Sequence, residues 1–338
     1  MTSRKLFAGT ATFAAAALAA VALANAAQSP VPVSSRAASP SPVPAVASGK
    51  AEPAAKPAKA AAPGTAVQAP LPAPDKGTFR ILLGGSEVGS EQFETSASGN
   101  AQIVHSETVI RVPGAPETRS KGDLRLSADG APLTYEWTSQ ADSKASGAVE
   151  FTDGTAKTGI IIGGPVTITR PVVPSATAQT VPTNSAVPFA AGNNVQVDVG
   201  AAQEMVAVTA VTPTSFTAIF SKNHAANVQA IRPVEQDFIF PSPRVAILDN
   251  NLYSQYALLA QLYDWSVKGQ QTFPVLIPQD MTPGSIMLES LGAKTVDGAS
   301  LEALRVNTAD IDIVAYFDAR HRLMRLEVPS ANVAVVRR

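Results

Sequence analysis

The chain has 338 residues, of which 45% are apolar and 16% are charged, and its formal net charge is −1. The absence of cysteine excludes disulfides, thiolate metal sites, cysteine catalysis and the lipid-modified cysteine of a bacterial lipoprotein. Residues 77–338 carry 19 Lys and Arg against 25 Asp and Glu, a net charge of −6, and this acidity predicts no nucleic acid partner, because phosphate binding needs a basic surface.

Residues 1–26 have the pattern of a secretory signal peptide. Two basic residues, Arg4 and Lys5, precede an apolar run over 6–24, and small residues follow at the positions that a signal peptidase requires. The alternative is an uncleaved membrane anchor, which the Ala-rich and weakly hydrophobic run disfavours. We therefore expect a periplasmic or secreted protein of the bacterial cell envelope, which meets a membrane only through this segment if it stays uncleaved.

Residues 27–76 are dominated by Ala and Pro and hold almost no large apolar side chain. A segment of this composition cannot bury enough apolar surface to offset the entropy lost on ordering. The sequence therefore predicts a disordered linker. A spacer is favoured over a basic arm that binds cell wall or another anionic surface.

Residues 77–338 are expected to form a single β-rich domain. Runs rich in Val, Ile, Thr and aromatic residues are separated by turn residues, a pattern typical of an antiparallel sheet. Leu133, Tyr135 and Trp137 alternate with polar residues, so one face of that strand meets something apolar. In the first part of the domain, strands are expected at 79–83, 87–97, 101–112, 118–127, 132–140, 145–152, 155–162, 165–170, 195–199, 204–211, 215–221 and 230–240. In the last part they are expected at 271–277, 285–291, 302–307, 310–317, 322–328 and 332–336.

A Pro-rich insertion is expected around 171–194, where four prolines stand among Ser, Thr and Ala. Proline lacks the amide hydrogen that a strand donates to its neighbour. The segment is therefore predicted to be a long loop or an irregular sheet edge.

The segment Asp249–Gly269 is predicted to be an amphipathic helix. Asp249 or Asn250 is expected to cap its first turn, and Lys268 with Gly269 is expected to end it. The apolar residues recur at helical spacing, which places them on one face. They are Leu252, Tyr256, Leu258, Leu259, Leu262, Tyr263 and Trp265.

The order of strands, helix and strands favours a mainly β fold. We expect a large curved antiparallel sheet, half-barrel-like, with one α-helix packed in its concavity and a disordered linker before it. Two stacked sheets with a helical plug at one end are the alternative. The sequence has no sharp repeat period, which disfavours a propeller or a solenoid.

Two segments carry a resemblance to known proteins, LDNNLYSQYALLAQLYDWSVKGQQTFPVLIP and AYFDARHRLMRLEVP. With them the chain resembles exported bacterial domains of unknown function, which are similar to the half-barrel of periplasmic lipoprotein carriers. The resemblance covers mainly 245–330, with a weaker match in 79–140. It implies a fold and provides no catalytic residue. Nothing comparable is visible in 171–240, which looks like an insertion.

Catalytic, metal and cofactor sites are not predicted. The three histidines, His105, His224 and His321, lie in separate segments, and none has a second ligand at helical or alternate-strand spacing. His321 is interpreted as a turn residue. No phosphate-binding glycine motif is present, so nucleotide binding has no support.

Two carboxylates, Asp310 and Asp312, lie on one face of an expected strand. Paired carboxylates can share a proton or bind calcium, but two ligands alone do not make a calcium site. Cross-strand pairing with nearby arginines is the preferred interpretation. These arginines are Arg320, Arg322 and Arg325.

Aromatic residues are predicted to line an apolar cleft, left where the helix incompletely fills the concave sheet. An ordinary core made of the same side chains is the alternative. The residues are Tyr135, Trp137, Tyr256, Tyr263, Trp265 and Tyr316.

These observations favour an exported, non-enzymatic protein that binds an apolar, lipid-like ligand or a protein partner of the envelope. One alternative is a structural assembly factor of the cell envelope, which would dock through an exposed strand edge. A hydrolase acting on envelope polymers is the other, and it would need carboxylates clustered on one face of the folded sheet.

Overall fold

The computed structural model describes residues 74–141, 143–267, 269–308 and 311–338. The expected signal peptide and all but the last residues of the expected linker lie outside the described residues. Asp75 and Lys76, assigned to the linker from composition, belong to the first strand. The Asp75 carboxylate accepts two hydrogen bonds, of 2.8 and 2.6 Å, from the Arg337 guanidinium, which joins the start of this strand to the last one. None of the helices in the described part is long and apolar enough to cross a membrane.

One large sheet of fifteen strands forms the main body of the molecule. Its spatial order runs from β14 through β7, β6, β5, β4, β3, β2 and β1 to β21, and then through β20, β19, β18, β17 and β16 to β15. The neighbours are antiparallel except for β15 and β16, which are parallel. The strands are β1 Asp75–Leu83, β2 Ser86–Ser98, β3 Ala101–Ile110, β4 Thr118–Ser127, β5 Pro132–Gln140, β6 Lys144–Thr152, β7 Thr155–Ile162, β14 Pro233–Ile239, β15 Ala246–Ile247, β16 Gln270–Ile277, β17 Thr282–Val296, β18 Ala299–Asn307, β19 Asp312–Phe317, β20 Leu323–Val328 and β21 Val333–Arg337.

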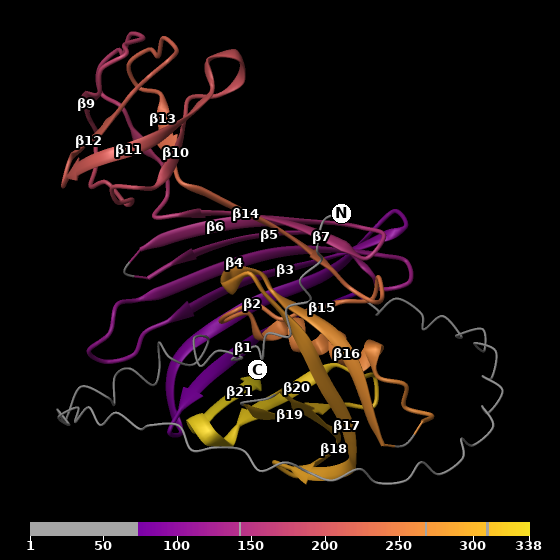
Figure 1. Cartoon of the computed structure of the whole chain (residues 1–338). Coiled ribbons are helices and arrows are strands. Elements are labelled where there is room, and N and C mark those ends of the chain that lie inside the picture. Colours follow the sequence, from indigo (N-terminus) through magenta and orange to yellow (C-terminus); the bar gives the residue numbers. More distant parts are fainter. Residues whose placement is uncertain (1–73, 142, 268, 309–310) are drawn as a thin grey trace, which may run out of the picture.

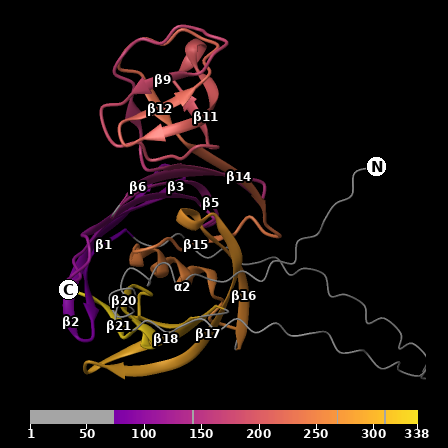
Figure 2. The ribbon, with the colours of Figure 1, turned by 60° about the vertical axis from the view of Figure 1, so that its left-hand side comes forward.

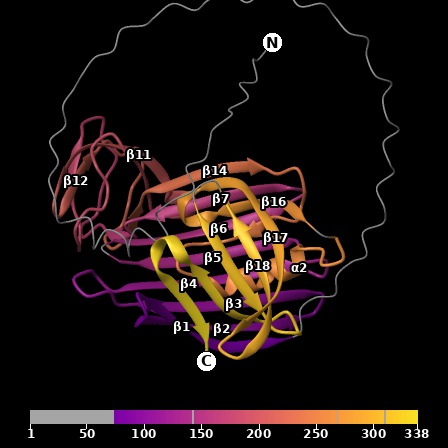
Figure 3. The same cartoon turned by 90° about the horizontal axis from the view of Figure 1, so that it is seen from below.

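This sheet is strongly curved. Figure 2 shows it curling around a short helical segment, and in Figure 3 β17 and β18 cross in front of the strands of the first half. Burial alternates along β4, where Ser120, Gly122, Leu124 and Leu126 are buried and Lys121, Asp123 and Arg125 are exposed. The buried side chains face the concavity, because a sheet curved around a core presents one face to it. The predicted mainly β fold, with a curved antiparallel sheet around a helix, is confirmed.

The helix inside the concavity is shorter than predicted. A 3-10 helix, η2 (Tyr253–Leu258), continues into the short α-helix α2 (Leu259–Leu262), and the backbone is extended at Tyr263. Tertiary hydrogen bonds explain this early end: the Tyr263 hydroxyl donates to the Gly269 carbonyl (3.0 Å) and accepts from the Ser290 amide (3.2 Å). The expected C-terminal cation, Lys268, lies outside the described residues. Asp249, the expected cap, does not cap η2, whose N-cap is Leu252.

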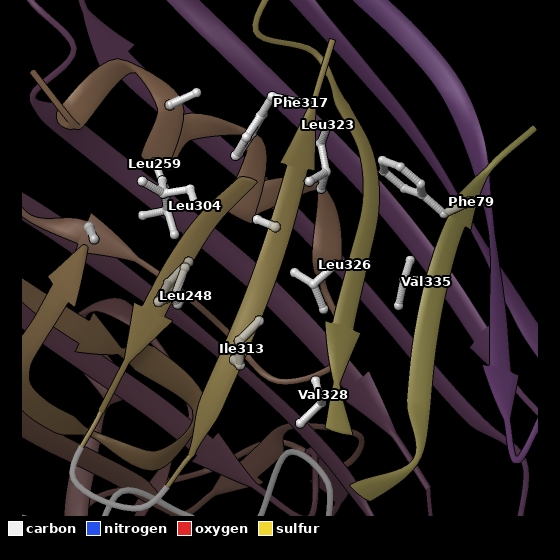
Figure 4. Packing of buried hydrophobic residues seen from close by; sticks show 14 of the residues in the cluster. Phe79, Leu248, Leu259, Leu304, Ile313, Phe317, Leu323, Leu326, Val328 and Val335 are labelled. Carbon is white, nitrogen blue, oxygen red and sulfur yellow. The ribbon is translucent and has the colours of Figure 1, made fainter. Parts of the chain in front are cut away.

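Residues 249–265, which we call the plug, join two apolar clusters inside the sheet. Leu252 packs with residues of β3 to β6, among them Leu124 and Tyr135. Leu259 packs with strands from the other half of the sheet, and Figure 4 shows it beside Leu304. Both leucines are almost completely buried. The plug is therefore part of the hydrophobic core.

Residues between β7 and β14 form a second unit, which we call the module (166–231), drawn above β14 in Figure 1. It has a six-stranded sheet in the order β8, β13, β10, β11, β12, β9, a 3-10 turn η1 (Gly200–Ala202) and an apolar core of its own. Its strands are β8 Val166–Thr167, β9 Gln179–Pro182, β10 Asn194–Val197, β11 Glu204–Thr212, β12 Ser215–Ala218 and β13 Gln229–Ile231. The remaining 3-10 turns, η3 (Pro278–Asp280) and η4 (Pro329–Ala331), lie in the large sheet's connections.

The segment 171–194, predicted to be a long loop or an irregular sheet edge, is part of this module, and its strand β9 is an edge strand of the six-stranded sheet. The only strand that lies wholly within the segment is the four residues of β9, but apolar residues along the segment, Val172, Val181 and Phe189, are buried in the module core. The Val172 amide and carbonyl also pair with His224 at 3.0 and 2.9 Å. Proline removes single backbone donors, and it does not prevent its neighbours from packing.

The His224 ring is expected to stabilise the module. It is buried, with Nδ1 3.2 Å from Asp198 Oδ2 and Nε2 2.6 Å from Glu204 Oε1. His224→Gln can keep only one of these contacts, so we expect a loss of roughly 2 kcal/mol, the value of a hydrogen bond to a charged group. The measurement is amide hydrogen exchange in β12, because both tryptophans lie outside the module. His105→Gln is the matched control: its exposed pair with Asp123 (2.7 Å) should contribute little. Unchanged exchange in the His224 variant would contradict this role.

Candidate ligand-binding cleft

A cleft of about 550 Å³ lies between the convex face of the large sheet and the module. Strands β4 to β7 and β14 form its floor, while Gln196 of β10 and Ile231 of β13 come from the module. The floor belongs to the convex face because Glu136 and Thr138 of β5 point away from their buried neighbours Tyr135 and Trp137. The volume is within the range of small-molecule sites. The lining residues of the sheet are Lys121, Asp123, Glu136, Trp137, Thr138, Ser146, Gly147, Ala148, Gly159, Ile160, Ile161, Pro233 and Glu235.

The strand register places a carboxylate at each end of a row of four residues on the floor of the cleft, and the two residues between them have very small side chains. Glu136 pairs with Ala148, Ala148 with Gly159, and Gly159 with Glu235, so the four form one row across β5, β6, β7 and β14. A Cβ built on Gly159 would meet nothing within 4 Å. The two middle positions hold the two smallest amino acids, and the space above them is the cleft.

A second row beside the first is less polar. Thr138 pairs with Ser146, Ser146 with Ile161, and Ile161 with Pro233. Together with Ile231 of the module, this row gives the cleft apolar walls. A ligand with an apolar body could therefore bury it here at a gain of roughly 25 cal/mol for each Å² removed from water.

The charges at the cleft do not balance. Lys121 is engaged by Glu107, with 3.0 Å between Nζ and Oε1, and Asp123 by His105, with 2.7 Å between Oδ1 and Nδ1. Among the described residues, Glu136 and Glu235 form no ion pair and are exposed. The free charge at this cleft is therefore negative.

The concave side holds two buried carboxylates at the start of the plug. Glu91 of β2 is fully buried and accepts hydrogen bonds from the amides of Tyr253 (2.8 Å) and Ser254 (3.0 Å). The N-cap residue of η2, Leu252, has no side chain that can accept a hydrogen bond. The Glu91 carboxylate therefore accepts the hydrogen bonds of the free amides in the first turn of η2. Burial raises the pKa of the Glu91 carboxyl to about 7, although the Ser254 and Tyr253 donors oppose the shift.

Asp249 is the second of these carboxylates. The Tyr135 hydroxyl donates to its Oδ2 at 2.7 Å, and the Gln279 amide donates to its Oδ1 at 3.0 Å. Burial raises its pKa to about 7 as well, against the effect of these donors. Neither carboxylate has a basic partner among the described residues. Both carboxylates hold the plug in place through these hydrogen bonds. The cavity beside the plug at Leu258 measures about 20 Å³, which is room for one water molecule.

The six aromatic residues predicted to line an apolar cleft do not surround a common space. Tyr135, Trp137 and Tyr263 are buried in the core, while Tyr256 and Trp265 are partly buried against it. Tyr316 is on the other face of β19, where its hydroxyl donates to Glu327 at 3.1 Å. Of the six, Trp137 alone borders the cleft described above. The alternative, that these side chains are ordinary core, describes Tyr135, Trp137 and Tyr263.

His321 has a left-handed backbone (φ 56°) in the turn before β20, and its ring stacks on Trp265 at 4.9 Å, so it is a turn residue. Asp312 pairs with Arg305 at 3.4 Å, and not with the arginines near β20. Asp310 lies outside the described residues. No group of three or more His, Asp or Glu side chains in the described part of the chain could hold a metal ion.

Apart from Trp137, sequence reasoning missed the residues of the cleft. Glu136, Ala148, Gly159 and Glu235 lie on the polar faces of four predicted strands, where a solvated surface is the ordinary interpretation. The one signal was Gly159 inside a strand, since glycine there often marks a place where a ligand or another chain segment approaches.

No family model matches the chain, and no curated protein matches it. Among solved structures, the chain is similar to the beta-barrel-like protein of domain of unknown function DUF1849 from Brucella abortus. The TM-score is 0.42 and the sequence identity is 9%, over 80% of this chain and 96% of the other.

Proposed function

We propose that the protein is a non-enzymatic binding protein of the bacterial cell envelope that holds a small, mostly apolar ligand between the convex face of its sheet and the module. The cleft of about 550 Å³, with its open floor at Gly159, carries this proposal. Its apolar walls would supply the affinity, and the polar residues at its rim would orient the ligand.

The concavity of the sheet is a less favourable place for this ligand. The plug occupies it, with Leu252 and Leu259 almost fully buried, and removing the plug would expose two parts of the core. The cleft needs no such change, because it is already open on the convex face. Export through the N-terminal segment would bring the protein to an envelope ligand.

The variant Gly159→Leu tests the proposal by filling the cleft. The new side chain would enter open space, so the fold should be retained, with a change in stability within about 0.5 kcal/mol. Native mass spectrometry of the chain purified from a bacterial periplasm should show a bound small molecule in the unmodified protein. We expect this mass to be lost in Gly159→Leu.

Lys157→Leu is the matched control, since Lys157 precedes Gly159 by two residues on the same face of β7 and does not line the cleft. It should retain the ligand. A bound mass that survives Gly159→Leu would place the ligand elsewhere and refute the proposal, and a chain that never carries a ligand would do the same.

A further inference from the structure

We infer that the cleft binds an elongated organic cation, an apolar chain with an amino group at each end. This inference rests on the proposed function and specifies its ligand. Three features of the cleft support it: the position of its unpaired carboxylates, the apolar floor between them, and the contribution of the module.

The two unpaired carboxylates lie at opposite ends of the row. Glu136 and Glu235 are separated by the strands that carry Ala148 and Gly159. Three strand spacings place their Cα atoms roughly 14 Å apart. A single small cation could not contact both carboxylates, whereas an extended chain with a charge at each end could.

The floor between the carboxylates suits a methylene chain. Ala148 and Gly159 give a low surface, and Ile161 and Pro233 of the neighbouring row give an apolar wall. The module adds Ile231 above this region. An unbranched apolar chain can lie along such a groove, because no side chain projects from Gly159.

Charge complementarity favours a dication over the other classes of elongated amphiphile. A ligand that covers Glu136 and Glu235 removes water from both carboxylates, and burying a carboxylate without a partner is costly. An anionic chain, such as a fatty acid, would add repulsion. The nearby Lys121 is already paired with Glu107 and would not offset it. Amino groups would instead form charge-assisted hydrogen bonds with both glutamates.

Isothermal titration calorimetry with the full chain tests this assignment. The probes are 1,8-diaminooctane, octylamine, 1,8-octanediol and octanoate, which share the chain and differ in the charge at its ends. We expect the diamine to bind at least tenfold more tightly than octylamine, with no binding of the diol or the acid. Glu136→Gln and Glu235→Gln should each weaken diamine binding about tenfold and bring it near the affinity of octylamine.

Glu150→Gln is the control, because Glu150 lies on β6 on the same face but outside the cleft. It should leave diamine binding unchanged. The assignment would be overturned if the diol or octanoate bound more tightly than the diamine. It would also be overturned if neither Glu136→Gln nor Glu235→Gln changed the affinity for the diamine. If none of the four probes binds while Gly159→Leu still removes a co-purifying mass, the diamine assignment fails and the proposed function stands. If that mass also survives Gly159→Leu, both fail.

Discussion

The free energy of unfolding is expected to increase by several kcal/mol as the pH is lowered from about 8 to about 5. The reason is the pair of buried carboxyls, Glu91 and Asp249, whose pKa values burial raises to about 7. In the unfolded chain these groups titrate near pH 4. Between about pH 4 and about pH 7 these two groups bind more protons in the folded protein than in the unfolded chain, so the stability of the protein falls as the pH rises through this range. At about 1.4 kcal/mol per pKa unit, each carboxyl contributes on the order of 3 kcal/mol.

The trend should reverse below about pH 4. Hydrogen bonds from Arg322 hold the pKa of Asp318 below its usual value, and those from Ser221 and His224 do the same for Glu204, in each case against the effect of burial. Stability from such groups is present above the unfolded pKa and is lost as the pH falls through the lowered folded pKa. The protein should therefore be most stable near pH 5.

Urea denaturation followed by tryptophan fluorescence, repeated between pH 4 and 8, measures this dependence. The double variant Glu91→Gln, Asp249→Asn should remove most of the slope between pH 5 and 7, because neither amide titrates. Glu136→Gln, an exposed carboxylate outside the core, should leave the slope unchanged. A slope that persists in the double variant would show that other groups cause it.

Leu252→Ala is expected to destabilise the domain by about 2–5 kcal/mol, the range for removing a fully buried leucine. Leu252 has no exposed surface and lies against β4, where a Cβ added to Gly122 would come within 2.7 Å of its Cδ1. That distance is too short for a contact between carbon atoms. An alanine at position 122 would therefore force Leu252 or Tyr135 to shift, and Gly122→Ala alone should cost about 1–3 kcal/mol.

The double variant should show that these two positions are coupled. With Leu252→Ala, the methyl group of Gly122→Ala enters part of the space that the leucine leaves, although it still approaches the Tyr135 hydroxyl at 2.9 Å. We expect the double variant to be more stable than the sum of the single effects predicts, by about 0.5–3 kcal/mol. Urea denaturation of the four proteins measures this coupling. Leu133→Ala, at a residue with 36% of its surface exposed, should have little effect, and strictly additive losses would contradict the contact.

Local patterns in the sequence located most strands of the large sheet. Alternation at Tyr135 and Trp137 identified β5 and its buried face, because the two faces of a strand differ in every second residue. Leu133, predicted on the same face, is exposed, since the register of β5 with β4 shifts by one residue at this position. The same local information placed the helical segment near Leu252 and Leu259, but it overestimated the length of the helix. The helix ends early because the Tyr263 hydroxyl donates a hydrogen bond to the Gly269 carbonyl and accepts one from the Ser290 amide, and helical periodicity contains no information about these bonds.

Strand pairing could not be deduced in the same way. Residues 230–240, predicted as one strand, are divided by Arg232 into β13 and β14, which belong to different sheets. The residues of the module outside 171–194 were predicted mostly as strands, but the separate sheet and core of the module were not predicted. A strand's own sequence specifies which face is buried and leaves open which partner covers it.

The sequence by itself determined a mainly β chain with a helical segment in its core, because period-two and helical patterns record burial one residue at a time. Only the tertiary structure decided where a ligand could bind. The row from Glu136 through Ala148 and Gly159 to Glu235 exists because β5, β6, β7 and β14 pair in one register, and a shift by one residue would turn each of these side chains to the other face. Register and the position of the module depend on contacts between distant segments, so they arise only when the whole chain folds.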